Sequence, residues 1–319
     1  MPTPEPSRPA ASGYVDHLID FYDAFAPHYD SWAGGVHRRV AARLAELAAP
    51  APRESALDVG TGTGLVAHLL AAGVGRGGQV IGIDLSAGMM EEARRRARAN
   101  MRFFGMAAER LVFKDASFDV VTYGLTLSFL VEPTVSLAEA YRVLRPGGRV
   151  ALASLRRNLD TESQEIFFGA INGFVEHHPL RLPRAPEDRA DFGEPAVLGG
   201  LLARAGFERA TFAEMVTGGR AGTASEWVDL MAGSGPLPHT LITALGPRLR
   251  RELETQLEAI MAPLGEDAYR HHHAFSFALA FKPGPDPAPP KRGSGGGDRG
   301  SRKRGDQPRE RRTAPGSIA

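Results

Sequence analysis

Residues 57–67 read LDVGTGTGLVA. Asp58 closes an apolar stretch, three glycines follow at alternate positions, Gly60, Gly62 and Gly64, and a helical pattern begins directly after them. Glycines at the end of a strand let the backbone approach a ligand closely, beside the partly positive N-terminus of the next helix. The dinucleotide fingerprint G-x-G-x-x-G places its third glycine one residue later than this chain does. The stretch therefore predicts a ligand-binding turn between a buried strand and a helix.

A second carboxylate stands at the end of the next apolar stretch. Residues 79–85 read QVIGIDL, so Asp84 closes this strand about twenty residues beyond the glycines. An acidic residue at such a place in an α/β sheet can accept hydrogen bonds from both hydroxyls of a ribose. Together, the glycine turn and Asp84 predict a ligand that contains a nucleoside.

The first half of the chain alternates strand and helix patterns. Short apolar runs bounded by glycine or polar residues predict strands at 55–61, 79–85, 117–124 and 148–154. Helical patterns lie between them at 64–73, at 86–100 with Ser86 as N-cap, and at 134–144. Strands separated by single helices form a parallel sheet with both faces covered, and such sheets bind ligands at the carboxyl ends of their strands.

The second half carries two longer excursions. Helical patterns at 164–178, 194–207, 223–233 and 242–264 surround strand patterns at 208–215 and 274–281. We therefore predict an α/β fold with a doubly wound, mostly parallel sheet and helical lid insertions at about 155–192 and 217–270. A lid over the carboxyl ends of the strands is where a substrate would be selected.

Composition excludes several classes of protein. The 319 residues are 43% hydrophobic and 24% charged, which is typical of a folded globular chain. Cysteine is absent, which excludes disulfide scaffolds, cysteine-ligated zinc, iron–sulfur clusters and thiol nucleophiles. Apolar runs fall short of the roughly 20 residues of a bilayer span, and the proline-rich start lacks the apolar core of a secretory signal. We expect a cytoplasmic protein without a membrane span.

The charge is distributed unevenly although the net charge is only +1. Downstream of Pro283 nine Lys or Arg residues face four Asp or Glu residues, and apolar residues are few. Such a segment cannot offset the entropy of ordering, so we expect an ordered domain at 14–282 between a disordered start at 1–13 and a disordered basic tail at 283–319. The tail also lacks aromatic residues, which favours a solvated extension over a contact with nucleic acid.

Further motifs extend the comparison beyond the glycine turn. Residues 106–121, MAAERLVFKDASFDVV, and residues 139–154, EAYRVLRPGGRVALAS, follow it in order. With the glycine turn and Asp84, the chain resembles the class I S-adenosylmethionine-dependent methyltransferases, in the small-molecule branch that includes ubiquinone and menaquinone C-methyltransferases. The resemblance is strong over about residues 20–154. It implies a Rossmann-like, seven-stranded sheet, S-adenosylmethionine as cofactor and a small-molecule methyl acceptor.

The resemblance also implies a set of cofactor contacts. The glycine loop would surround the methionine and ribose, Asp84 would bind the ribose hydroxyls, and apolar side chains would flank the adenine. One departure concerns Ala107-Ala108-Glu109, where the family usually has Asp-Ala-Glu, so a backbone carbonyl near Ala108 would replace the missing carboxylate. The implied cofactor-binding residues are Asp58, Gly60, Thr61, Gly62, Gly64, Asp84, Leu85, Met89, Ala108 and Tyr123.

Candidates for acceptor contacts lie in the opening helix and in the lids. Residues 21–32 resemble the family's first helix, in which a Tyr-Asp pair closes over the cofactor, and they carry Tyr29 with Tyr22 on a neighbouring face. Aromatic residues at helical spacing also serve as core residues, and this alternative stays open for Trp227 above all. The candidate acceptor contacts are Tyr22, Tyr29, Phe168, Trp227 and Met231.

Candidates for acid or base catalysis are His28, Tyr29, Glu176 and His177, although the histidines and Glu176 also fit solvated loop residues. The run His271-His272-His273 invites a metal assignment. Consecutive residues of a strand point to alternate faces and cannot all face one ion, so we expect no metal site.

Methyl transfer from a sulfonium needs alignment and a dry site more than a protein nucleophile. The lid aromatics favour C- or O-methylation of a small, apolar or aromatic acceptor in quinone-like or secondary metabolism. Two alternatives stay open at this point: a relative that does not methylate, such as a cyclase, hydroxylase or decarboxylase, and a nucleic-acid-binding module that uses the basic tail. The residues fix neither the acceptor nor the oligomeric state.

Overall fold

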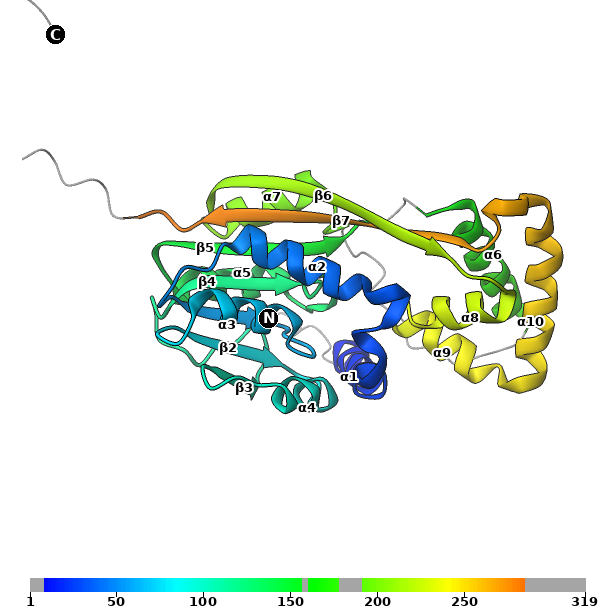
Figure 1. Ribbon diagram of the computed structural model, residues 1–319, viewed down its shortest axis with the longest axis horizontal. Coiled ribbons are helices and arrows are strands. Elements are labelled where there is room, and N and C mark those ends of the chain that lie inside the picture. Colours follow the sequence, from blue (N-terminus) through cyan, green and yellow to red (C-terminus); the bar gives the residue numbers. More distant parts are fainter. Residues whose placement is uncertain (1–8, 157–159, 178–190, 285–319) are drawn as a thin grey trace, which may run out of the picture. The chain divides into compact units, whose positions relative to one another are not determined.

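The computed structural model describes residues 9–156, 160–177 and 191–284, which belong to one compact unit that ends at Gly284 (Figure 1). Helix α1 (Pro9–Tyr29) begins inside the 1–13 segment for which the sequence predicts no regular structure. Most of the predicted basic tail lies outside the described residues.

Within the described residues, seven strands form one sheet in the order β3-β2-β1-β4-β5-β7-β6. The first five strands in sequence run parallel, and β7 lies antiparallel between β5 and β6. This confirms the predicted doubly wound, mostly parallel sheet. The strands are β1 (Ser55–Val59), β2 (Gln79–Asp84), β3 (Met101–Gly105), β4 (Phe118–Gly124), β5 (Leu144–Leu155), β6 (Glu208–Arg220) and β7 (Arg270–Phe281).

The sequence pattern predicts some strands more clearly than others. The central strand β1 is buried at every position from Ala56 to Val59, as expected for a parallel strand covered on both faces. The sequence pattern does not single out β3, because this edge strand buries only Met101 and Phe103 and leaves its other three residues exposed. A strand with two buried residues is too short a signal for periodicity to detect.

Helices cover both faces of the sheet. One face is covered by α2 (Trp32–Ala48), α3 (Leu65–Val74) and α4 (Ala87–Arg95), and the other by α5 (Pro133–Val143) and α7 (Pro195–Arg204). Ser86 is the N-cap of α4 as the sequence predicts, because its hydroxyl accepts the backbone N–H of Met89 at 3.1 Å.

The two predicted lid segments come together as one helical cap beside the ends of β6 and β7 (Figure 1). The segment predicted as one helix from 242 to 264 is broken, because Gly246 has φ +67° and Pro247 follows it. None of the helices in the part of the chain that is described has the length and apolar character needed to cross a membrane. The cap consists of α6 (Glu162–His177), α8 (Ala224–Ala232), α9 (Pro236–Ala244), α10 (Gly246–Met261) and the short helix η2 (Ala262–Asp267).

Trp227 lies at the centre of the cap. Its side chain is completely buried, and its ring meets that of Phe167 edge to face with centroids 6.3 Å apart. Met231 is buried in the same cluster, and Phe168 packs against it. The cap therefore has its own hydrophobic core, separate from the two clusters that line the faces of the sheet.

We expect Trp227→Ala to destabilise the protein by about 3–5 kcal/mol, because it removes a fully buried aromatic side chain and leaves a cavity. For a chain of this size the melting temperature falls by about 6–20 °C. Thermal unfolding followed by circular dichroism measures the shift. Val112→Ala, at a position that is 76% exposed, is the control and changes stability by less than about 0.5 kcal/mol. Equal melting temperatures for wild type and Trp227→Ala would contradict a core role.

Candidate functional site

A cavity of about 160 Å³, open to solvent, lies at the carboxyl ends of the parallel strands. Its walls come from α1, the glycine loop, the end of β2, the start of α4 and the loops that follow β3 and β4. The lining residues are Val15, Leu18, Ile19, Tyr22, Tyr29, Gly60, Gly62, Asp84, Leu85, Ser86, Met89, Met106, Ala108, Glu109, Gly124, Leu125, Thr126, Phe129, Leu130 and Val131.

A buried carboxylate supports the glycine loop from below. Asp58 is 1% exposed and accepts hydrogen bonds from the hydroxyls of Thr61 and Thr122, each at 2.7 Å. Burial raises the pKa of Asp58 to about 6, although these hydrogen bonds lower it. Above it, Gly60 has φ +63°, and a Cβ at this position would come within 2.3 Å of the Thr126 side chain. The loop conformation therefore requires glycine at position 60.

Asp84 joins the loop to the next helix. One carboxylate oxygen accepts the N–H of Gly62 at 2.8 Å and the other accepts the N–H of Ser86 at 2.9 Å. Burial raises the pKa of Asp84, and the backbone hydrogen bonds oppose this shift. Because Asp84 also lines the cavity, its remaining lone pairs can accept hydrogen bonds from a ligand hydroxyl.

The next part of the cavity wall is apolar. Leu85 is 47% exposed and lies beside Met89, Met106 and Ala108. Glu109, in the Ala-Ala-Glu segment, accepts the N–H groups of residues 131 and 132 and so holds the loop that follows β4. A flat apolar group such as a purine ring would find contact area here.

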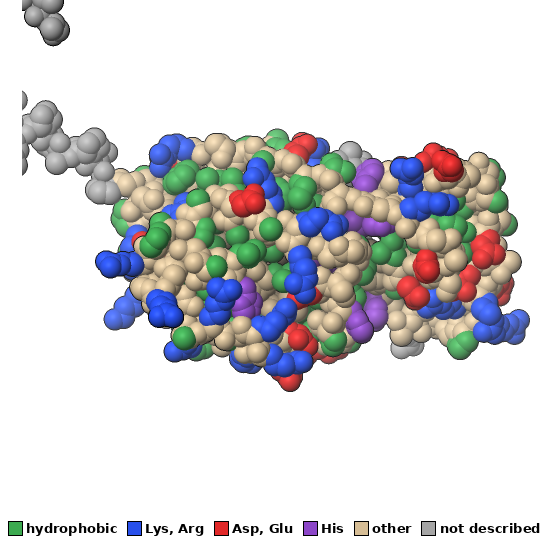
Figure 2. All heavy atoms as spheres, viewed as in Figure 1, with side chains coloured by type: hydrophobic (Ala, Val, Ile, Leu, Met, Phe, Trp, Pro, Cys, Tyr) green, Lys and Arg blue, Asp and Glu red, His purple; other side chains and the backbone are tan. Residues whose placement is uncertain are grey.

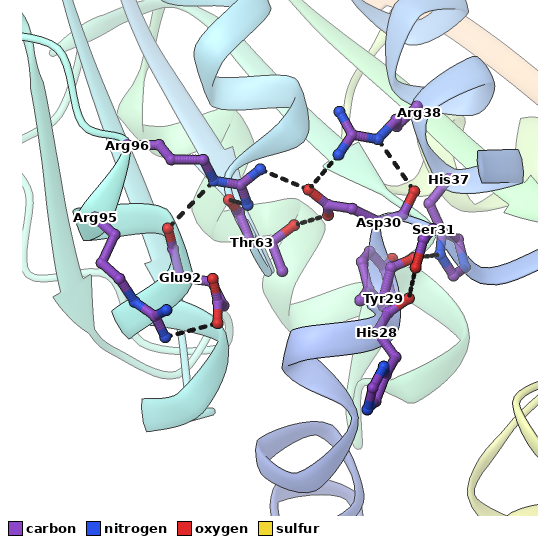
Figure 3. A network of polar contacts seen from close by, with 10 residues as sticks. All are labelled: His28, Tyr29, Asp30, Ser31, His37, Arg38, Thr63, Glu92, Arg95 and Arg96. Carbon is purple, nitrogen blue, oxygen red and sulfur yellow. Dashed lines mark hydrogen bonds and ion pairs between the residues drawn. The ribbon is translucent and has the colours of Figure 1, made fainter.

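Helix α1 covers the cavity and is fastened by two carboxylates. Asp23 accepts hydrogen bonds from the Ser86 hydroxyl at 2.5 Å and from the Gly88 N–H at 2.9 Å, at the start of α4. Seven residues later, Asp30 accepts the Thr63 hydroxyl at 2.6 Å and pairs with Arg96 at 2.6 Å (Figure 3). Helix α1 is thereby fixed to the glycine loop and to both ends of α4.

A smaller cavity adjoins the first one and shares Tyr29, Gly60, Gly62, Gly124 and Leu125 with it. Beneath the glycine loop it is further lined by Asp58, Thr61, Thr63 and by His37 on α2. The two cavities together surround the glycine loop, with Tyr29 between them.

The matching protein family is described as a methyltransferase domain, and its model covers residues 57–152. A ubiquinone/menaquinone biosynthesis C-methyltransferase UbiE from Acidiphilium cryptum is 30% identical over 225 residues, which are 65% of this chain and 89% of that protein. The chain belongs to the class I S-adenosylmethionine-dependent methyltransferases. Its cofactor is therefore S-adenosylmethionine, and the apolar and polar walls of the large cavity fit the adenine and the ribose of this molecule.

Two further comparisons agree with this membership. Aklanonic acid methyltransferase DauC from a Streptomyces species is 33% identical to the methyltransferase over 147 residues, 45% of this chain and 67% of that protein. The solved structure of Haemonchus contortus phosphoethanolamine N-methyltransferase 2 with S-adenosylhomocysteine has a TM-score of 0.52 and 19% identity. It covers 85% of this chain and 60% of that one, and at this identity it shows the fold alone.

Most sequence-predicted residues of the methyltransferase lie at the cavities. Tyr22 and Tyr29 line the same cavity with ring centroids 6.4 Å apart, so the prediction that they occupy neighbouring faces is wrong. Seven residues are two helical turns, which returns a side chain to the same face. The other predicted residues that line one or both cavities are Asp58, Gly60, Thr61, Gly62, Asp84, Leu85, Met89 and Ala108.

Two predicted cofactor contacts are not brought to the cavities. Tyr123 is fully buried on β4, and its hydroxyl bonds to the carbonyl and the hydroxyl of Ser136 at 3.0 and 2.9 Å. Gly64 packs against Ala93 and lines neither cavity. Its φ of +82° at the N-cap of α3 serves the turn into the helix.

The lid residues of the methyltransferase that we predict to contact the acceptor are not at the cavities either. Phe168, Trp227 and Met231 belong to the cap core, where burial of apolar area fixes them. His28 is exposed, and the structure does not describe the side chains of Glu176 and His177.

The histidine run extends into β7 and alternates between faces of the strand. His271 and His273 are each 8% exposed, and their ring centroids are 5.3 Å apart. Figure 2 shows histidine side chains on the visible surface near the boundary between the sheet and the cap. Among the described residues, groups of three or more potential metal ligands are absent. Burial lowers the pKa of His273 to about 4, with neighbouring positive groups adding to the shift.

Sequence reasoning on the methyltransferase misses three residues of the site. Asp23 lies on α1 and Asp30 directly follows its last residue, so their seven-residue spacing corresponds to about two helical turns. His37 follows the pair Gly34-Gly35, which indicates a sharp turn back toward Tyr29. The seven-residue spacing and the glycine pair are the signals that could have found them.

We expect Asp84→Ala to weaken S-adenosylmethionine binding by about 10- to 100-fold, because hydrogen bonds to a charged group contribute about 1.5–3 kcal/mol. Isothermal titration calorimetry measures the dissociation constant. Asp119→Ala is the matched control, since Asp119 also accepts a backbone N–H, from Ser55 at 2.8 Å, but lies at the other end of the sheet. Equal affinity of folded Asp84→Ala and wild type would contradict a ribose contact.

The buried His273 predicts a loss of stability in acid. Its folded pKa of about 4 lies below the ordinary value of 6.5, so the unfolded chain binds the proton more readily and stability falls as pH drops from about 7 to 5. This residue contributes about 1–2 kcal/mol to that fall. Asp58 has a raised pKa, so its effect on stability between pH 7 and pH 5 is opposite in sign to that of His273. The informative quantity is therefore the difference between wild type and His273→Phe in urea unfolding at pH 7 and pH 5, with a smaller acid loss expected in the variant. If wild type and His273→Phe lose the same free energy of unfolding between pH 7 and pH 5, His273 takes up no proton on unfolding.

Proposed function

We propose that this methyltransferase methylates carbon or oxygen on a small acceptor with an apolar or aromatic ring, in quinone-like or secondary metabolism. The observation that carries the proposal is the set of apolar and aromatic side chains that line the same cavity as Asp84. Leu18 and Ile19 of α1 line this cavity together with Phe129 and Leu130, and the ring centroids of Tyr22 and Phe129 are 5.5 Å apart. A ring-shaped apolar molecule would bury area against these side chains.

The names of the relatives support the same class of acceptor. One relative acts in ubiquinone and menaquinone biosynthesis as a C-methyltransferase, and another is an aklanonic acid methyltransferase. For this chain, ubiquinone-type and aklanonic-acid-type rings are both compatible with an apolar wall, and they define the acceptors worth testing.

The cofactor would be held by Asp84 at the ribose hydroxyls, by Leu85, Met89 and Ala108 at the adenine, and by the glycine loop at the methionine. When bound, S-adenosylmethionine supplies an activated methyl group on a sulfonium. Alignment of the acceptor and removal of water then account for most of the acceleration that a protein must provide. Helix α1, fastened by Asp23 and Asp30, is the element that would exclude water.

The two tyrosines of the cavity would act as hydrogen-bond donors. Burial raises the pKa of Tyr22 and of Tyr29 well above the ordinary phenol value, and the Asp84 carboxylate adds to both shifts. Both phenols therefore keep their protons at neutral pH. They can orient an acceptor oxygen but cannot remove a proton from it.

The proposal is tested with S-adenosylmethionine and 1,4-dihydroxynaphthalene, an acceptor that offers both hydroxyl groups and ring carbons. We expect formation of S-adenosylhomocysteine together with a product that is heavier by one CH2 unit, and the fragmentation pattern distinguishes C- from O-methylation. The control is Asp84→Ala at a subsaturating concentration of S-adenosylmethionine, which should form product more slowly than wild type. If the acceptor is converted to another product and no S-adenosylhomocysteine forms, the reaction is not a methylation and the proposal is replaced. If neither this acceptor nor a panel of other quinols and phenols is converted, the proposal is overturned.

A further inference from the structure

His37 occupies a fixed place beside the methionine end of the cavities. The chain turns back between α1 and α2 because Ala33, Gly34 and Gly35 have φ values of 47°, 64° and 76°. This turn carries the His37 ring back to Tyr29, whose backbone carbonyl lies 2.7 Å from Nδ1 (Figure 3). A carbonyl oxygen only accepts, so the Nδ1 atom carries the proton and Nε2 has a free lone pair in the neutral ring.

Two aromatic rings hold the plane of the imidazole. The Tyr29 ring stacks on it with centroids 3.8 Å apart and 7° between the planes, and the Trp32 ring lies at 5.3 Å and 24°. Trp32 is itself fixed, because its indole N–H donates to the carbonyl of Leu230 at 2.9 Å. Among the described residues, we find no hydrogen-bond partner for Nε2 of His37, which lines the cavity with Asp58 and the glycine loop.

The other titratable groups of the cavities are already engaged. The tyrosines are phenols at neutral pH, as described above. Each carboxylate accepts hydrogen bonds that hold part of the cavity wall: Asp58 from Thr61 and Thr122, Asp84 from Gly62 and Ser86, and Glu109 from Val131 and Glu132. Among the described titratable residues of the two cavities, His37 differs in having a nitrogen, Nε2, that accepts no hydrogen bond from the cavity wall.

We propose that Nε2 of His37 accepts the proton that the methyl acceptor loses, and that the acceptor therefore carries a hydroxyl group or an acidic ring C–H at its reacting centre. This inference rests on the proposed function and narrows its substrate class to phenols, enols and hydroquinones. The acceptor atom forms a bond to the methyl carbon as the carbon–sulfur bond breaks and sulfur keeps the electron pair. The acceptor proton passes to Nε2 and leaves to solvent after product release.

The surroundings of His37 keep the ring neutral at rest and disfavour a lasting positive charge. Burial lowers its pKa to about 4, opposed by the Tyr29 carbonyl and the nearby Asp30, so the lone pair is free at neutral pH. His273 on β7, whose pKa is also lowered, lies near enough for the charged forms of the two rings to disfavour each other, so the imidazolium does not persist. While it lasts, the faces of Tyr29 and Trp32 stabilise the charged ring by cation–π attraction.

The test compares wild type, His37→Gln and His28→Gln with 1,4-dihydroxynaphthalene under single-turnover conditions. We expect the transfer rate of His37→Gln to fall by about 10²- to 10⁴-fold, the usual contribution of a positioned base. The wild-type rate stays constant between about pH 5.5 and 8.5, whereas the His37→Gln rate rises with pH as the acceptor ionises without help. His28→Gln, an exposed neighbour, behaves like wild type.

Two readouts do not depend on turnover. Calorimetry should give an S-adenosylmethionine dissociation constant for His37→Gln within about threefold of wild type, and a large loss of affinity at unchanged rate would instead make His37 a cofactor contact. Nitrogen-15 spectra of histidine should show the Nδ1–H form at pH 7, and an Nε2–H form would overturn the proposal. An inactive wild type with the expected tautomer contradicts the proposed function, whereas equal rates and pH profiles in wild type and His37→Gln contradict the role of His37.

Discussion

The carboxylate of Asp84 joins three elements of the structure at one point. Its two oxygens accept N–H groups from the glycine loop after β1 and from the start of α4, while its own backbone ends β2. Each of these N–H groups lies where a turn or helix begins and lacks a partner within its own element. A buried carboxylate that satisfies both is stable only while both stay in place. The geometry of the cavity floor therefore follows from one side chain.

Helix α1 is held by the same segments that Asp84 joins, and it forms a further wall of the cavity. Its carboxylates bind the same segments that Asp84 organises, Asp23 at the start of α4 and Asp30 at Thr63 of the glycine loop. Residues of α1 line the cavity, so these hydrogen bonds also hold one of its walls in place. Tyr22 and Tyr29 belong to α1 and line the cavity. The position of α1 therefore sets where these two side chains lie, and also where the Tyr29 carbonyl that orients His37 lies.

The sequence predicts the parts of this structure that depend on local chemistry. The glycine loop, the buried parallel strands and the Ser86 cap each follow from a few adjacent residues, and they appear where the pattern places them. The pattern misses β3, whose two buried residues form no period, and it cannot assign Trp227, because core and pocket tryptophans share one apolar helical spacing.

The role proposed for His37 could not be predicted from the sequence either. Its chemistry depends on the Tyr29 carbonyl and on a turn through three left-handed residues, of which Ala33 gives no sign in the sequence. Likewise Asp30 reaches Arg96 across 66 residues. Contacts of this kind arise only once the sheet has brought distant segments together.

The cap and the cavity have separate tasks as a result. Phe168, Trp227 and Met231 build a core that would hold the cap together whatever the acceptor, while the apolar wall of the cavity comes from α1 and from the residues after β4. The two parts meet where Trp32 donates to Leu230 and where His239 packs on Phe21. Since Trp32 also stacks on His37, a change in the packing of α8 would reach the proton acceptor through one indole ring. Under the proposed function, selection of the acceptor would fall to α1 and to residues 127–131, and Trp32 would connect the cap to His37.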